Sequence, residues 1–82
     1  MTDHVLKTLG PYWEAVKAGT KTFEVRRDDR GFKCGDVLVL QNVTDAGYFD
    51  PPQQIRKRVT YILTGGQFGI EPGYVVMGLG DE

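Results

Sequence analysis

Charged side chains of both signs crowd one short stretch, residues 19–30 (GTKTFEVRRDDR). Within it, Lys21, Glu24 and Arg26 alternate in sign along what reads as a strand. An ammonium, a carboxylate and a guanidinium at this spacing could hold a phosphate or the polar edge of a ligand. The same pattern is typical of a solvated strand, where each exposed ion pair contributes under about 1 kcal/mol.

Lys21 and Glu24 are also the candidates for catalysis. Such a pair could polarise a water, while the neighbouring cations stabilise the charge that develops on a phosphate during RNA cleavage. The sequence offers no complete set of nucleophile, base and orienting group. It therefore favours a binding protein over an enzyme and leaves open a hydrolase acting on RNA or a modified nucleoside.

Other side chains are candidates for contacts with a nucleic acid. His4 is the single histidine; it could donate to a phosphate, although a lone histidine on an apolar strand is more often packed and hydrogen-bonded. Tyr48, in a polar loop, could stack on a base or fold back on the domain. Cations at Lys7 and Arg30 flank the charged stretch, and a second basic run lies at residues 56–58.

The segments that must position these side chains read as strands separated by Gly-rich turns. Five are expected, at residues 4–9, 21–27, 36–43, 55–64 and 74–80. The third begins with consecutive apolar residues, which is typical of a strand covered on both faces. In the second, if Phe23 and Val25 fill the core, Glu24 and Arg26 face outward or into a cleft.

One short helix is expected at residues 10–19. Pro11 suits its first position, where the missing N–H costs nothing. Trp13 and Val16 share one face, and Gly19 favours a left-handed C-terminal cap. The helix is too short to be stable without packing on the sheet.

Length and composition limit the classes of protein that remain. The 82 residues suffice for one domain, 1–82, with a small core, and the net charge of −1 gives no general attraction for polyanions. No apolar run approaches the roughly 18 residues of a membrane span, and no signal-peptide pattern opens the chain. We therefore expect a cytoplasmic protein with no membrane contact. A single cysteine, Cys34, argues against a zinc site, and neither metal nor cofactor is implied.

Several motifs carry a resemblance that covers nearly the whole chain. They are His4-x-Leu6-Lys7, Gly19-x-Lys21-Thr22-x-Glu24-x-Arg26, and Asp29-Arg30 followed by Gly35-Asp36. On these motifs the chain resembles a small bacterial and phage domain family of undefined function, in the ASCH group of the PUA-like superfamily. The resemblance implies an α+β fold, a PUA-like mixed β-barrel of about five strands with one short helix, and a groove for RNA or a modified nucleotide.

The chain departs from the resembled pattern at two places. Relatives carry a Y-T-G-R-type segment in the middle, where this chain reads GYFDPPQQIRKR and retains only Tyr48. Some ASCH relatives are amidohydrolases with a threonine two residues before the motif arginine, where this chain has Glu24. A carboxylate is a far weaker nucleophile toward an amide, so the same chemistry is not expected unchanged.

Together, the residues and the resemblance predict a module that binds RNA or a nucleotide-like ligand. The expected ligand-binding residues are His4, Lys7, Lys21, Glu24, Arg26, Arg30 and Tyr48. Structural roles are expected for Asp29, which would pair with Arg30, and for Gly35 and Asp36, which would shape a turn. A phage-type protein-interaction domain is the third open class, and a weak homodimer is possible.

Overall fold

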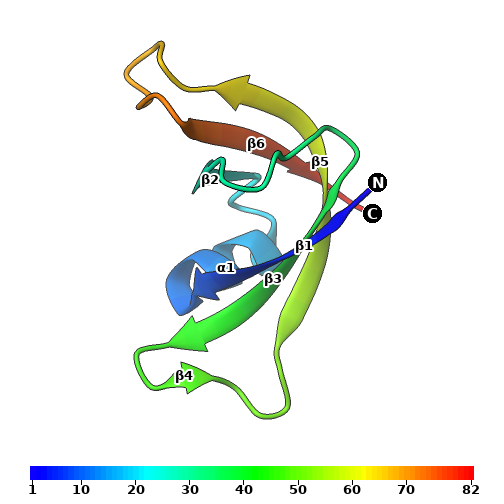
Figure 1. Ribbon diagram of the computed structural model, residues 1–82. Helices are drawn as coiled ribbons and strands as arrows, with labels where there is room; N and C mark the ends of the chain where they lie inside the picture. The colour runs from blue at the N-terminus through cyan, green and yellow to red at the C-terminus, as the bar shows by residue number, and fades with distance from the viewer.

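The computed structural model describes all residues, 1–82, as one curled sheet with a single helix (Figure 1). The elements in chain order are β1 (Asp3–Leu9), α1 (Gly10–Ala18), β2 (Phe23–Arg27), β3 (Val37–Thr44), β4 (Gly47–Tyr48), β5 (Gln54–Thr64) and β6 (Tyr74–Gly80). All five expected strands are present, with ends shifted by at most two residues. The two-residue β4 was missed because it lies within the least regular stretch of the sequence.

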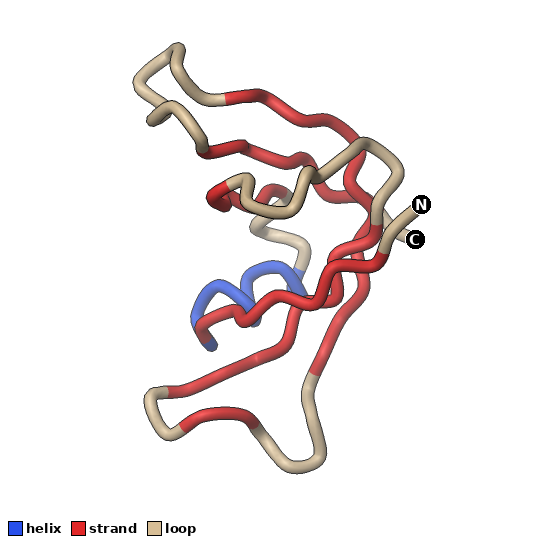
Figure 2. The backbone as a smooth tube through the Cα atoms, in the orientation of Figure 1, coloured by secondary structure: helices blue, strands red, loops and turns tan.

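The sheet is mixed and open. Its strand order is β1-β3-β5-β6-β2, with β4 paired to β3 beside this path. Only β1 and β3 run parallel, and the other pairs are antiparallel. The sheet curls into a half-barrel, with α1 on its open side (Figures 1 and 2). The fold is therefore a small α+β domain in which β1 and β2 are the two edge strands.

The core lies between the centre of the sheet and the helix. Residues 37–40 of β3 are all buried, which confirms that both faces of this strand are covered at its start. In α1, Trp13 and Val16 are the buried residues, and the Trp13 indole N–H donates to the carbonyl of Leu40 at 2.9 Å. Gly19 ends the helix with φ +83°, as its predicted left-handed cap requires.

The structure reverses the orientation of β2 considered from the sequence, in which Phe23 and Val25 would fill the core. These side chains are 45% and 50% exposed, whereas Glu24 is only 3% exposed. Alternation fixes which residues share a face but not which face is inward. Here the inner face carries Glu24 and Arg26, because Glu24 is paired with cations there. The outer face of β2 is left partly exposed to water.

Salt bridges join the two ends of the chain. Arg56 contacts Asp3 at 3.1 Å and Glu82 at 2.7 Å, and Lys57 contacts Asp81 at 3.0 Å. The basic run at 56–58 is therefore largely neutralised by acidic neighbours. Cys34 is a free, exposed cysteine. The only helix is α1, which is far too short to cross a membrane.

Candidate functional site

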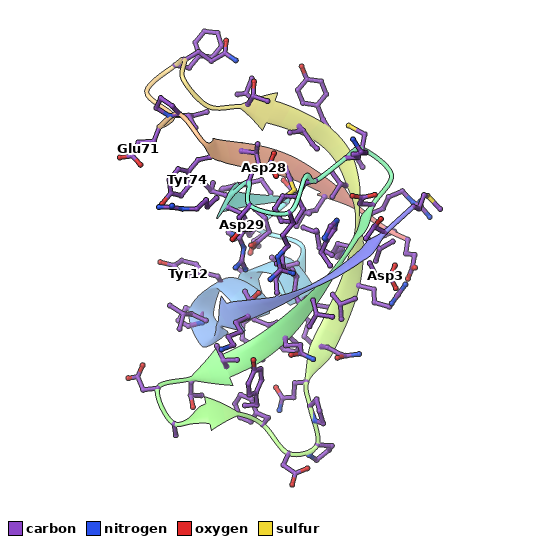
Figure 3. The ribbon with its side chains drawn as sticks, viewed as in Figure 1. Asp3, Tyr12, Asp28, Asp29, Glu71 and Tyr74 are labelled. Atoms are coloured by element: carbon purple, nitrogen blue, oxygen red, sulfur yellow. The ribbon has the colours of Figure 1, made fainter.

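A pocket of about 410 Å³ lies between the two edge strands of the half-barrel. Its lining residues come from β1, α1, the loop before β2, and β2 itself: Lys7, Thr8, Leu9, Tyr12, Lys21, Glu24, Val25 and Arg26. We call it the edge pocket. Its volume falls in the range of about 300–1,000 Å³ that small-molecule sites occupy. Figure 3 shows Tyr12 on the open side of the half-barrel, on the same side as Asp28 and Asp29.

Glu24 is the centre of the polar network in the edge pocket. Its Oε1 accepts a hydrogen bond from Lys21 Nζ at 2.6 Å, and its Oε2 accepts one from Arg26 Nε at 3.0 Å. A buried carboxylate is tolerated only when it is paired in this way. The consequence is positional: one buried anion fixes two cationic head groups at the wall of the pocket.

Two arginines cross the gap between the edge strands. Arg26 Nη2 donates to the carbonyl of Lys7 at 2.8 Å and to Thr8 Oγ1 at 3.2 Å. Arg30 Nη1 donates to the carbonyl of Val5 at 3.0 Å. Side chains thus connect β1 to the β2 region where no backbone ladder does, and the space left between the edges is the pocket.

Aromatic rings lie beside the cations. Lys21 Nζ is 5.7 Å from the ring centre of Tyr12 and 5.0 Å from that of Phe23. Lys7 Nζ lies 5.5 Å from the ring centre of Tyr48. Tyr12 and Tyr48 are each 55% exposed, so both rings retain surface on which a flat ligand could stack.

The edge pocket is locally basic although the chain is not. Lys7, Lys21 and Arg26 stand against the single carboxylate of Glu24, which gives the pocket a formal charge of +2 within a chain of net charge −1. A second pocket of about 340 Å³ has the opposite character, with Asp28, Asp29 and Glu71 against Arg27. A polyanion would be attracted to the first pocket and repelled from the second.

The structure brings together only part of the residue set predicted from sequence. Lys7, Lys21, Glu24 and Arg26 line the edge pocket. The remaining predicted residues do not line it. Arg30 binds the β1 edge next to the pocket, and the Tyr48 ring contacts Lys7 of the pocket lining. His4 is buried elsewhere.

Four lining residues were missing from the set predicted from sequence: Thr8, Leu9, Tyr12 and Val25. Tyr12 lies at i, i+4 spacing from Val16, a pattern that is typical of core residues, but Tyr12 is exposed and Val16 is buried. The available signal was the position of Tyr12 in the first turn of a helix that directly follows the strand bearing Lys7.

His4 belongs to a structural cluster around Asp36. The His4 Nε2–H donates to Asp36 Oδ2 at 2.9 Å, and the imidazole meets the Phe32 ring edge-on at 4.7 Å. Asp36 also accepts the backbone N–H groups of Lys33 at 3.0 Å and Thr2 at 3.2 Å. Gly35, at φ +92°, makes the turn that places Asp36 there.

The structural pair expected of Asp29 is present but loose. Its Oδ1 lies 3.8 Å from Arg30 Nε, with both side chains exposed. A pair of this kind contributes little to stability. Arg30 is instead held by its hydrogen bond to the carbonyl of Val5.

Acid should unfold the protein partly through Asp36. The hydrogen bond from His4, and then those from the Lys33 and Thr2 amides, hold the pKa of Asp36 below its ordinary 3.8 despite the opposing effect of burial. A depressed pKa in the folded state stabilises the fold above the unfolded-state value of about 3.9, and this stabilisation is lost as the pH falls further. Urea unfolding from pH 6 to pH 2.5 should therefore show a smaller acid-induced loss in Asp36→Asn than in wild type.

The matched control for that experiment is Asp29→Asn, which removes an exposed carboxylate. Its acid-induced loss of stability should equal that of wild type. An Asp36→Asn protein whose stability falls with acid as steeply as wild type would contradict the assignment.

No set of three or more His, Cys, Asp or Glu side chains in the structure is arranged to hold a metal ion.

The fold and the pocket together define a small α+β half-barrel domain with a basic cleft between its edge strands. Comparison with family models matches residues 3–79 to a family described as a domain of unknown function (DUF3850), and the chain belongs to this family. No curated protein matches the chain.

Proposed function

We propose that this domain binds RNA or a nucleotide-like ligand in the edge pocket. The observation that carries the proposal is the grouping of three cations and a half-exposed tyrosine around one buried carboxylate, in a pocket of about 410 Å³. The motif resemblance to the ASCH group of PUA-like domains supports the same ligand class. It also supports reading the half-barrel as a PUA-like pseudobarrel.

The hydrogen-bond donors left over in the pocket suit a phosphate. Arg26 uses Nε and Nη2 within the protein, which leaves Nη1 without a protein acceptor. Lys7 Nζ likewise makes no hydrogen bond to the protein and only faces the Tyr48 ring. Two cationic donors beside aromatic rings are a common arrangement for a single-stranded nucleic acid, in which bases stack and phosphates pair with cations.

The same contacts argue against Glu24 as the general base of a hydrolase. Both of its carboxylate oxygens already accept hydrogen bonds from cations, so a substrate proton would have to displace Lys21 or Arg26. Glu24 is better suited to positioning the two cations. The hydrolase and the protein-interaction domain remain as the alternative outcomes of the experiment below.

The proposal is tested by fluorescence anisotropy with a labelled, unstructured single-stranded RNA, from 20 mM to 200 mM salt. Affinity for a single strand falls with a log–log slope of about −0.7 per neutralised phosphate, so two or three contacts should give a slope of about −1.4 to −2.1. The RNA should be recovered intact on a denaturing gel.

Other outcomes would overturn the proposal. An unchanged anisotropy at the lowest salt would exclude RNA binding, and free nucleotides should then be tried by calorimetry before the ligand class is abandoned. Shortened RNA would identify a hydrolase. A pulldown that recovers a protein partner and no nucleic acid would identify the interaction domain.

A further inference from the structure

Alternate residues of β2 direct their backbone N–H and C=O groups toward β6 and toward the free edge of the sheet. The carbonyl of Thr22 accepts from the Leu79 N–H at 2.9 Å, and the Asp28 N–H donates to Gly73 at 2.8 Å, both toward β6. In an antiparallel ladder such residues alternate with residues whose N–H and C=O point the other way. The backbone groups of Phe23, Val25 and Arg27 therefore point to the free edge of β2, away from β6.

Only one of these three residues keeps both backbone groups free. The carbonyl of Phe23 accepts from Lys21 Nζ at 2.8 Å, and the carbonyl of Arg27 accepts from the Asp29 N–H at 3.0 Å. Val25 lies opposite Val76 in a pair without ladder hydrogen bonds, and no other element bonds its N–H or C=O. Val25 also lines the edge pocket and is half-exposed.

On the opposite edge of the pocket, two backbone carbonyls already accept hydrogen bonds from side chains. The carbonyls of Val5 and Lys7, which point to the free edge of β1, accept hydrogen bonds from Arg30 and Arg26. A peptide that adds to a sheet as a strand needs several successive free backbone groups. Here a single residue offers one donor and one acceptor side by side, which is too little for a strand and enough for one flat polar group.

We propose that the N–H and C=O of Val25 bind the Watson–Crick edge of one unpaired nucleobase. This inference rests on the proposed function and specifies how that pocket recognises its ligand. Every base carries a donor beside an acceptor on this edge, and proteins read it on bases that are splayed out of single strands. Tyr12 supplies a ring for stacking, and Arg26 Nη1 and Lys7 Nζ supply donors for the phosphate.

Two consequences distinguish this arrangement from general charge attraction. A base in a duplex has its Watson–Crick edge occupied, so a single strand should bind at least tenfold more tightly than a fully paired, blunt-ended RNA duplex of equal charge. A single nucleotide fills the site, so a 5′-nucleoside monophosphate should compete with the RNA, whereas inorganic phosphate at the same concentration should not. A monophosphate that fails to compete while the RNA binds would overturn the inference that one nucleotide fills this site.

The direct test is Val25→Pro, which removes the N–H that points into the pocket and leaves the ladder to β6 intact. Proline is tolerated on an edge strand where its missing N–H faces solvent. The matched control is Val25→Ala, which shortens the side chain and keeps both backbone groups. Loss of one hydrogen bond, with a base group left unpaired, should weaken binding of the single-stranded RNA about tenfold in Val25→Pro. Val25→Ala alters the pocket wall but keeps the N–H and C=O, so it should lose clearly less affinity than Val25→Pro.

The possible failures are separable. Equal binding by both variants would overturn the role of Val25 while the proposed function stands. No binding by the wild-type protein would overturn the proposed function itself. If circular dichroism shows that Val25→Pro is unfolded, the decision passes to the amide resonance of Val25 in wild type. That resonance should move downfield as the RNA is added, and an unmoved resonance at saturation would overturn the inference.

Discussion

Glu24→Ala is expected to destabilise the fold by about 3 kcal/mol, because it leaves two cations facing each other without their shared anion. Removal of one partner from a buried ion pair costs about 3–5 kcal/mol. The low end applies here, because the side chains of Lys21 and Arg26 keep 19% and 25% of their exposure and can recover some hydration. Urea unfolding at pH 7 measures the change directly.

The control for this prediction is Glu14→Ala. Glu14 is an exposed acid on α1 without a salt bridge, so its removal should change stability by no more than about 0.5 kcal/mol. Glu24→Gln should lie between the two, since an amide can accept one hydrogen bond but carries no charge. If Glu24→Ala unfolds at the same urea concentration as Glu14→Ala, Glu24 does not hold the two cations as described.

Arg26→Ala should weaken RNA binding about 10- to 100-fold, while Arg27→Ala should change it less than threefold. The two variants remove the same charge from adjacent residues, but Arg26 lines the edge pocket and Arg27 lies over the Tyr74 ring at 5.6 Å. A hydrogen bond between charged groups contributes about 1.5–3 kcal/mol, which corresponds to the larger effect. Fluorescence anisotropy at one low salt concentration compares the two.

Arg26 also bonds to Lys7 and Thr8, so a loss of fold must be separated from a loss of binding. The titrations are therefore made at 10 °C, on protein shown to be folded by circular dichroism. Equal losses of affinity in Arg26→Ala and Arg27→Ala would mean that RNA responds to net charge alone and not to the edge pocket.

Local sequence signals were sufficient where one physical effect dominates. Pro11 and Gly19 set the limits of α1, because one lacks an N–H and the other accepts a left-handed backbone. The consecutive apolar residues 37–40 identified a strand covered on both faces, because no polar residue interrupts them.

The faces of β2 could not be obtained in the same way. Its apolar residues, Phe23 and Val25, lie on the exposed side, and its buried side carries Glu24. The carboxylate is neutralised by Lys21 and Arg26, which are close in sequence. The contact that ties this face to the rest of the fold is tertiary, since the Arg26 guanidinium continues to the β1 backbone. The contact between Arg26 and the Lys7 carbonyl could not be predicted, because a helix and a loop separate the two residues in sequence.

In the candidate site, too, local sequence signals were sufficient for some residues and tertiary contacts determined the others. Lys21, Glu24 and Arg26 could be singled out because they are close in sequence and match a motif. Tyr12 could not, because its place in the pocket depends on how α1 crosses the open side of the half-barrel (Figure 1). Thr8 could not, because the pocket exists only where β1 and β2 come close in space. His4 matched the motif as well, yet its partner Asp36 lies 32 residues away and holds it in a buried cluster.

The most direct test of the edge pocket as the RNA site is ultraviolet crosslinking of the bound single-stranded RNA, followed by mass spectrometry of the peptides. If crosslinking followed exposure alone, Phe68, at 82% exposed, and Tyr61, at 66%, would react first. The account predicts instead that the principal crosslink lies on Tyr12 and that excess unlabelled RNA removes it. A principal crosslink on Phe68 or Tyr61, with Tyr12 unmodified, would contradict it.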